Sequence, residues 1–289
     1  MKYAFIADYK VQFSIGGMCR ALSVSRSGFY EWQQRGISAR QQSDAALLHR
    51  IREVDCTTHG SYGAVKTWKA LQQEGVACGK HRVARLRRQA GIESRRKRRF
   101  RVTVEHHKMP QAAPDLLVRR FCAVKPNQVW VGDMTFIQTR GGWLYLTMLM
   151  DLYSRKIVGW SMSDKPNEAL ARGALDMAIA HRQPASGLIH HTDQGAIYRS
   201  TGYQKRMESC GIQPSMGGKK SAYDNAPAES FFSTLKNELI HHIDFKTRDE
   251  ARSAVFAYIE LFYNARRLHQ ALNYQSPMQF EGRAKVCPY

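Results

Sequence analysis

The chain has 289 residues, more than one ordinary domain needs, so two or three compact units are expected. Lys and Arg number 44 against 24 Asp and Glu, and the net charge of +20 indicates a polyanionic partner. Hydrophobic residues make up 43% of the chain, which excludes a disordered basic tail and places the charge on folded domains.

Membrane and secreted proteins are also excluded. The longest apolar stretch, 143–150, is far shorter than the ~20 residues of a spanning helix. The first residues contain Asp8 and no cleavage site of small residues, so no secretory signal is expected. The six cysteines form no Cys-x-x-Cys pair, and we interpret them as reduced, mostly buried thiols. A cytoplasmic, nucleoid-associated protein is the expectation.

Residues 1–40 have the pattern of a helix-turn-helix segment. Ser14 and Ser25 can each cap a short helix with apolar residues at helical spacing, and residues 23–24 form the turn between them. The second helix would bring Arg26 to a DNA groove. Two short helices of a purely structural bundle give the same pattern, so both interpretations stay open here.

Residues 41–101 read as a helical DNA-binding domain that ends in a basic tether. Helices are expected at 44–55, 63–74 and 80–90, and the last shows a basic face opposite its apolar face. Such charge either contacts phosphates or is simply solvated; because residues 1–110 carry 22 basic and 8 acidic residues, we favour phosphate contact. The candidate contacts are Arg82, Arg85, Arg88, Arg95, Arg96, Lys97, Arg98 and Arg99. Residues 102–125, with Pro110 and Pro114 inside the range and Pro126 directly after it, read as a linker.

From residue 126 to 289 the pattern changes to that of an α/β domain. Three β-rich stretches joined by short turns predict an antiparallel meander, and alternating helices and strands follow. This order predicts a mixed five-stranded sheet flanked by helices on both faces. The expected strands are 129–139, 143–152, 156–163, 188–192 and 213–216, and the expected helices are 167–182, 201–210, 227–242 and 249–263.

Three acidic residues occupy positions suited to chemistry. Asp133 lies inside an otherwise apolar strand, where an ionised carboxylate needs a partner or a metal. Asp193 follows the fourth strand at a glycine turn, and Glu229 lies in the first turn of a helix with Asp224 or Asn225 as its expected cap. Lys236 shares the helix face of Glu229 and can meet a phosphate there.

Other polar residues receive simpler interpretations. Asp151 is expected in a turn or an ion pair, and Glu238 lies too deep in its helix to replace Glu229. His191 either assists Asp193 or packs in the core. The pairs His106-His107 and His241-His242 lack cysteine partners, so no zinc site is expected there. Lys219 and Lys220, in a glycine-containing loop, either touch DNA or keep the loop soluble.

The segments around the three acids resemble a known family signature. Trp-Val-Gly-Asp-Met-Thr at 130–135, His-Thr-Asp-Gln-Gly at 191–195 and the segment 223–236 are similar to the catalytic motifs of insertion-sequence-three family transposases, specifically the second-frame (OrfB-type) product, a relative of retroviral integrases. Further segments fit as well, at 25–30, 63–91, 142–146, 151–155 and 263–277.

The resemblance implies a ribonuclease H-like catalytic domain that binds two Mg²⁺ ions, with Mn²⁺ able to substitute, through Asp133, Asp193 and Glu229. Asp133 would bridge both ions. It further implies double-stranded DNA partners, namely the terminal inverted repeats of an element and a target. A first-frame (OrfA-type) protein or fusion, and a homo-oligomer in a synaptic complex, are also implied.

The resulting hypothesis is the catalytic subunit of a DDE transposase, which cleaves element-end DNA and joins its 3′-OH to another strand. Two-metal chemistry suits both steps, since the nucleophile must be activated and the leaving oxygen stabilised. Two rivals remain open: a structure-selective nuclease with the same fold, and a DNA-binding regulator whose acids are structural. Recognised repeats, target choice and subunit number cannot be obtained from the sequence.

Overall fold

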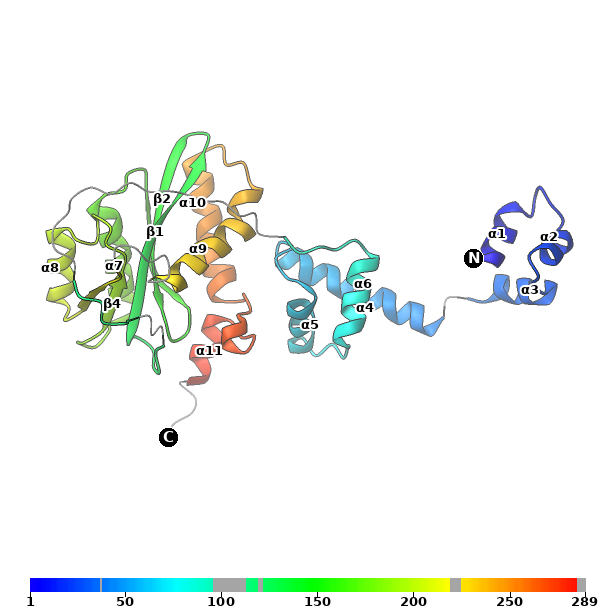
Figure 1. Cartoon of the computed structure of the whole chain (residues 1–289), viewed down its shortest axis with the longest axis horizontal. Coiled ribbons are helices and arrows are strands. Elements are labelled where there is room, and N and C mark those ends of the chain that lie inside the picture. Colours follow the sequence, from blue (N-terminus) through cyan, green and yellow to red (C-terminus); the bar gives the residue numbers. More distant parts are fainter. Residues whose placement is uncertain (37, 96–112, 119–121, 219–224, 285–289) are drawn as a thin grey trace.

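The computed structural model describes residues 1–36, 38–95, 113–118, 122–218 and 225–284. Three bodies follow one another along the chain: a small helical bundle, a second helical domain and a sheet domain (Figure 1). The predicted fold class, an all-α region followed by an α/β domain, is confirmed. Within the described ranges, no helix has the length and apolar character needed to cross a membrane.

The first bundle contains α1 (Lys2–Tyr9), α2 (Ile15–Ala21) and α3 (Arg26–Gln34). The predicted caps are present, because the Ser14 hydroxyl accepts from the Gly17 amide and the Ser25 hydroxyl accepts from the Gly28 amide. Helix α1 is an addition to the predicted elements, and it completes a small core with the two capped helices. That core is formed by Ile6, Met18, Cys19 and Phe29.

The second helical domain contains α4 (Ala39–Thr57), α5 (Ala64–Gln73) and α6 (Lys80–Gln89). Helix α4 begins five residues before the predicted start at 44, since Ser38 and Gln41 form a reciprocal capping box. Apolar residues spaced at helical intervals meet in one core, so the predicted periodicity is confirmed. These residues include Leu47, Ile51, Val54, Leu71, Val83 and Leu86.

The sheet has the order β3-β2-β1-β4-β5. Strands β1 (Val129–Thr139), β2 (Gly142–Asp151) and β3 (Ile157–Ser163) form the predicted antiparallel meander. Strand β4 (Ile189–Thr192) lies parallel to β1, and β5 (Gln213–Met216) lies parallel to β4. The two short parallel strands lie beside only the first part of β1, so the β1–β2 hairpin extends beyond them.

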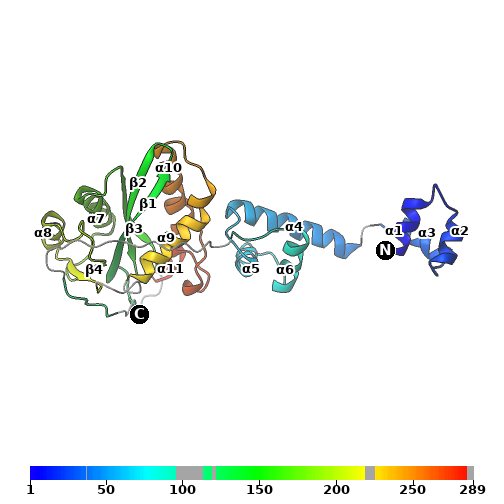
Figure 2. The same ribbon diagram turned by 45° about the horizontal axis from the view of Figure 1, so that its top comes forward.

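Helices cover both faces of the sheet (Figures 1 and 2). Helices α7 (Glu168–Arg182) and α8 (Thr201–Ser209) pack on one face around Trp130, and α9 (Ala226–Glu238) and α10 (Arg248–Phe256) pack on the other around Val131. Successive side chains of β1 thus point to opposite faces of the sheet and pack in separate hydrophobic cores. Helix α7 approaches β3 closely at Gly159, where a Cβ atom would lie 2.2 Å from the carbonyl oxygen of Ala174.

The C-terminal part departs from the predicted helices. The helix expected at 227–242 ends at Glu238 and continues as a 3₁₀ turn, Ile240–His242. The helix expected at 249–263 is α10 followed by a π-helical segment, Ala257–Asn264. A 3₁₀ turn, Gln270–Leu272, and helix α11 (Pro277–Ala284) are additional elements.

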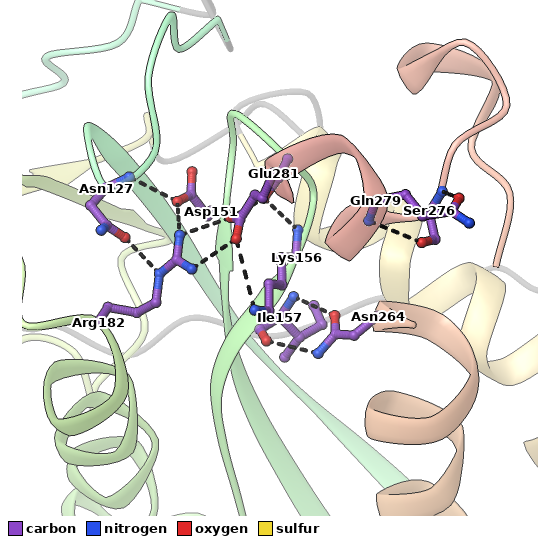
Figure 3. A network of polar contacts seen from close by, with 10 residues as sticks. Asn127, Asp151, Lys156, Ile157, Arg182, Asn264, Ser276, Gln279 and Glu281 are labelled. Carbon is purple, nitrogen blue, oxygen red and sulfur yellow. Dashed lines mark hydrogen bonds and ion pairs between the residues drawn. The ribbon is translucent and has the colours of Figure 1, made fainter. Parts of the chain in front are cut away.

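Helix α11 is attached to the sheet by a buried polar network (Figure 3). Glu281 accepts from the Ser154 hydroxyl at 2.6 Å and from Arg182, which also reaches Asp151 at 3.0 Å. The amide of Asn127 donates to the same Asp151 carboxylate at 2.8 Å. Asp151 therefore has the turn and ion-pair role predicted for it.

Part of the predicted linker packs on the sheet domain. The Met216 amide donates to the Pro114 carbonyl at 3.3 Å, and the Leu116 amide donates to the Ser215 hydroxyl at 2.9 Å. Leu117 is 6% exposed and joins the main core. Residues 113–117 are thus a covering segment of β5 rather than free linker, because their backbone and apolar groups find partners there.

The cysteines differ from the prediction of mostly buried thiols. Among those in described positions, Cys19 is buried, Cys78 and Cys210 are half-buried, and Cys56 and Cys122 are exposed. All five are free, as predicted. The prediction of burial was wrong because a single cysteine is not part of a repeating apolar pattern. The sequence around it therefore does not show whether its side chain faces the core.

The second helical domain also contacts the sheet domain directly. Tyr62 is 2% exposed, and its hydroxyl accepts from the Leu268 amide at 2.7 Å. The ring of Phe262 lies 6.5 Å from that of Tyr62, centroid to centroid. Arg95, a predicted DNA contact, donates to the carbonyl oxygen of Glu238 at 2.8 Å. The two domains therefore share one apolar and polar interface.

Candidate active site

The sheet brings Asp133, on β1, and Asp193, directly after the end of β4, into the same region. Val131 pairs with His191 in the parallel β1–β4 ladder, and each aspartate lies two residues further along its own chain. The charge of Asp193 acts on Asp133, so the two carboxylates lie in one region although Asp193 is already past the end of its strand. The Asp133 carboxylate accepts from the Met134 amide at 2.7 Å, and that of Asp193 accepts from the Gly195 amide at 3.0 Å.

Helix α9 brings Glu229 to the same region. Asn225 occupies the N-cap position, but its side chain makes no cap bond. Instead its amide donates to the Gly132 carbonyl at 2.9 Å, which ties the start of α9 to β1 beside Asp133. The other cap candidate, Asp224, lies outside the described residues. Phe231 and Leu235 are buried on the side of α9 away from Glu229, as the helical spacing predicts.

The three carboxylates interact electrostatically. Burial and the negative charges of Asp193 and Glu229 together raise the pKa of Asp133 to about 8, against the opposing effects of the Met134 amide and the Lys236 ammonium. Burial also raises the pKa of Asp193 and that of Glu229. Asp133 therefore lies within the field of both other acids, which is the arrangement expected where negative charge is gathered for a cation.

Lys236 completes this group on the predicted face of α9. Burial lowers its pKa, and the charge of Asp133 opposes that effect. Its ammonium lies 5.1 Å from the ring centroid of Phe136 on β1. The side chain thus stands between the carboxylates and the outer part of the β1–β2 hairpin.

The residues fit a hard divalent cation. Among the residues that the structure describes, no three His, Cys, Asp or Glu side chains lie close enough together to form a ready metal-binding group. The donors are nevertheless all carboxylate oxygens, which Mg²⁺ prefers together with water. A cation held there would offset the repulsion from Asp193 and Glu229 that helps to raise the pKa of Asp133.

Two further groups near the aspartates were not singled out by the sequence. Tyr198 is 1% exposed, and its pKa is raised first by burial and then by the charge of Asp133. His190, also buried, bonds the Tyr203 hydroxyl at 2.8 Å and occupies the space where a Cβ atom of residue 132 would lie, which explains Gly132. No periodic signal marks these contacts, because each joins residues of different elements, β4 with α8 for His190 and the loop before α8 with β1 for Tyr198.

His191 and Glu238 have structural partners. His191 bonds the Ser215 hydroxyl at 2.9 Å inside the core, which agrees with the packing interpretation. The Glu238 carboxylate accepts from Arg267 at 2.7 Å and from the Tyr258 hydroxyl at 2.8 Å. Glu238 is therefore engaged away from the acid group, as the sequence analysis expected.

The predicted DNA contacts differ in their surroundings. Arg82 and Arg85 each donate to Asp44 at 2.7 Å, so their charge is partly opposed, contrary to the expectation of an unopposed face. Arg88 is exposed, and Arg26 is exposed with its guanidinium 5.8 Å from the Tyr30 ring centroid. The remaining candidates lie outside the described residues: Arg96, Lys97, Arg98, Arg99, Lys219 and Lys220.

Family models place this architecture in a class. Residues 123–222 and 229–284 match models described as "Integrase core domain", and residues 42–100 match an "HTH-like domain". A sheet domain with an integrase core, preceded by a helical DNA-binding module, defines a transposase of the polynucleotidyl transferase class.

Curated relatives are similar over nearly the full length. The chain is 40% identical over 286 residues to "Transposase InsF for insertion sequence IS3A" of Escherichia coli (strain K12), covering 98% of this chain and 99% of that one. It is 42% identical over 264 residues to an "Insertion element IS600 uncharacterized 31 kDa protein" of Shigella sonnei, covering 91% and 97%. The transposase for IS904 of Lactococcus lactis is 41% identical over 86% of this chain and 98% of its own. The protein belongs to the insertion-sequence-three (IS3) family of transposases.

Two solved structures of retroviral proteins are similar to this chain at low sequence identity. One chain of a simian T-cell lymphotropic virus intasome in complex with the PP2A regulatory subunit B56 gamma is 18% identical, covers 82% of this chain and 76% of its own, and has a TM-score of 0.49. The HTLV-2 integrase catalytic core domain in complex with magnesium (dimeric form) is 18% identical, covers 55% and 98%, and has a TM-score of 0.42.

Proposed function

We propose that this transposase cleaves element-end DNA and joins the freed 3′-OH to another strand, and that Asp133, Asp193 and Glu229 carry this chemistry by holding two Mg²⁺ ions. The observation that supports the proposal most is that Asp133, inside a strand, lies in the electrostatic field of both Asp193, just after a strand, and Glu229, at a helix start. Mn²⁺ is proposed to substitute for Mg²⁺.

The proposed role of each side chain follows from its position. Bound Mg²⁺ would activate the attacking oxygen and stabilise the leaving 3′-oxygen. Asp133 and Asp193 are oriented by the amides of Met134 and Gly195, and α9 presents Glu229 toward them. Lys236, two helical turns after Glu229, is placed to hold the phosphate next to the one that reacts.

Substitution of each acid tests the assignment. Asp133→Asn, Asp193→Asn and Glu229→Gln should each abolish cleavage and joining of labelled element-end DNA in Mg²⁺ while leaving DNA binding within about twofold. Asp249→Asn is the control, since its side chain is 94% exposed on α10. Strand joining by any of the three active-site variants would overturn the assignment. Cleavage without joining by the unchanged protein would favour the nuclease, and binding alone the regulator.

We also propose that α6 contacts the DNA backbone. A cavity of about 560 Å³ lined by Arg40, Ser43, His81, Arg82 and Arg85 gives this helix a basic concave face. Replacing Arg82, Arg85 and Arg88 by Ala should lower the slope of log affinity against log salt by roughly 1 for each phosphate that is no longer neutralised. Arg172→Ala, 52% exposed on α7, is the control. An unchanged slope would remove α6 from the interface.

The wider organisation follows from the same proposal. We assign a helix-turn-helix segment to 1–40, a DNA-binding domain with its tether to 41–101, a linker to 102–125, of which residues 113–117 pack along β5, and the catalytic domain to 126–289. A first-frame protein or fusion would supply further end recognition, and a homo-oligomer would bring two DNA ends together. Such a protein acts in the cytoplasm, at the nucleoid.

A further inference from the structure

A cavity of about 630 Å³ has Lys236 in its wall, and the charge of this lysine acts on Asp133. It is bounded by the outer part of the β1–β2 hairpin on one side and by the end of α9 and the chain that follows it on the other. Strand β4 pairs with β1 only as far as Val131, so in the described sheet no strand covers this part of β1 on that side. Its lining includes Phe136, Gln138, Trp143, Lys236, His241 and Ile243.

The walls of this hairpin cavity expose aromatic surface. Phe136 and Trp143 are each 45% exposed, and Ile243 is 40% exposed. The two rings stand nearly perpendicular, with an interplanar angle of 87° and centroids 5.1 Å apart. Apolar surface gathered in a concave site, next to a reactive centre, is typical of a ligand-binding surface.

The polar groups of the cavity suit a nucleotide. Lys236 supplies a cation, and Gln138 and His241 supply an amide and an imidazole that can bond the edge of a base. Burial and the nearby charge of Lys236 lower the pKa of His241, which keeps its ring neutral at physiological pH. The carboxylate at the rim, Asp244, is neutralised by an ion pair with Arg140.

Lys236 joins this cavity to the acid group. Its ammonium lies against the Phe136 ring and also in the field of Asp133. A phosphate held by Lys236 therefore has the carboxylates on one side and the aromatic walls on the other. A base attached to that phosphate reaches the cavity, provided that it has left the duplex stack.

We propose that the hairpin cavity binds one unstacked nucleobase of the DNA strand whose phosphate lies at the carboxylates, with Trp143 as the stacking surface. This inference rests on the function proposed above. Stacking of a base on an aromatic ring explains why Trp143 is exposed at this position. It also selects DNA ends that open easily, since a paired base must first be extruded.

The test uses the full-length Asp133→Asn protein, so that binding is measured without cleavage and independently of the catalytic assignment. Element-end DNA carries 2-aminopurine at one position at a time around the cleavage site. One position should change strongly in 2-aminopurine emission on binding. At that position Trp143→Ala should weaken binding by about 5- to 100-fold, the range expected when one base–aromatic stack is removed.

The decisive comparison removes the base. With an abasic nucleotide at that position, the unsubstituted and Trp143→Ala chains should bind equally. Phe256→Ala is the control: Phe256 is 49% exposed and meets Trp160 edge-on, as Phe136 meets Trp143, yet lies outside the cavity. It should bind within about twofold in both DNAs.

Three results would overturn the proposal. In the first, no position shows a change in 2-aminopurine emission on binding. In the second, the weakening of DNA binding caused by Trp143→Ala persists on abasic DNA. In the third, Trp143→Ala lowers the oligomeric state in light scattering without any dependence on the base, which would make the cavity a contact for a second copy. The emission measurement needs no variant, so it decides the matter even if Trp143→Ala folds poorly. Joining activity in Asp133→Asn would reject the catalytic assignment alone.

Discussion

Replacing Glu238 by Gln distinguishes a structural acid from Glu229, the acid proposed to be catalytic on the same helix. Glu238 and Arg267 are 12% and 11% exposed, and the carboxylate accepts two bonds from the guanidinium, at 2.9 and 2.7 Å. The Tyr258 hydroxyl supplies a third bond at 2.8 Å. Glu238→Gln leaves the charge of Arg267 buried without its partner.

The magnitude follows from that burial. Removing one member of a buried ion pair costs about 3–5 kcal/mol, and the amide oxygen of Gln retains some hydrogen bonding, so we expect a decrease in stability of about 3 kcal/mol. The double variant Glu238→Met with Arg267→Met should be close to the unchanged protein, because no unpaired charge remains. A double-mutant cycle of urea unfolding midpoints measures the coupling.

The assay pairs stability with activity. Glu238→Gln should lower the unfolding midpoint and yet retain strand joining at temperatures where the chain is folded. Glu229→Gln should abolish strand joining and leave the unfolding midpoint unchanged. If Glu238→Gln abolished joining while the unfolding midpoint stayed unchanged, Glu238 would belong to the catalytic group and our assignment on α9 would be wrong.

Three further predictions concern contacts that hold the folded domains together. Tyr62→Phe leaves the Leu268 amide without its acceptor and should cost about 1–3 kcal/mol in urea unfolding; an unchanged midpoint would mean the domain interface is not formed in solution. Burial lowers the pKa of His190 to about 4, below its unfolded value near 6.5, so its share of stability, up to about 3 kcal/mol, is present above pH 6.5 and disappears as pH falls toward 4. An imidazole NMR signal of His190 that titrates near 6.5 in the folded protein would contradict this. Gly159→Ala places a methyl group against the Ala174 carbonyl and should cost at least about 1–3 kcal/mol; a fully stable variant would refute the close approach of α7 to β3.

Local signals in the chain predicted most elements because each was self-contained. The caps Ser14 and Ser25 and the β-rich runs of the meander depend on neighbours within a few residues. Helix α11 carried such a signal too, since Ser276 and Gln279 form a reciprocal cap around Pro277, but its apolar face was too short to stand out.

Charge and long-range contacts were harder to predict. The basic face of α6 looked unopposed in sequence, yet Asp44, far away on α4, pairs with Arg82 and Arg85. Arg95 looked like part of a DNA-binding tether, whereas its guanidinium bonds the Glu238 carbonyl. A contact between residues that are tens or hundreds of positions apart produces no repeating pattern in the sequence.

The amino-acid sequence by itself determined the family and the mixed sheet, because motifs, caps and strand patterns act over short stretches of chain. It also singled out the three acids that we propose as the site. Only the tertiary structure decided that Asp133 lies in the electrostatic field of both other acids and that the Asn225 side chain links α9 to β1 by a hydrogen bond. It also decided that Phe136 and Trp143 line a cavity together with Lys236. Those facts depend on which distant side chains become neighbours, and packing of the helices on the sheet is what brings them together.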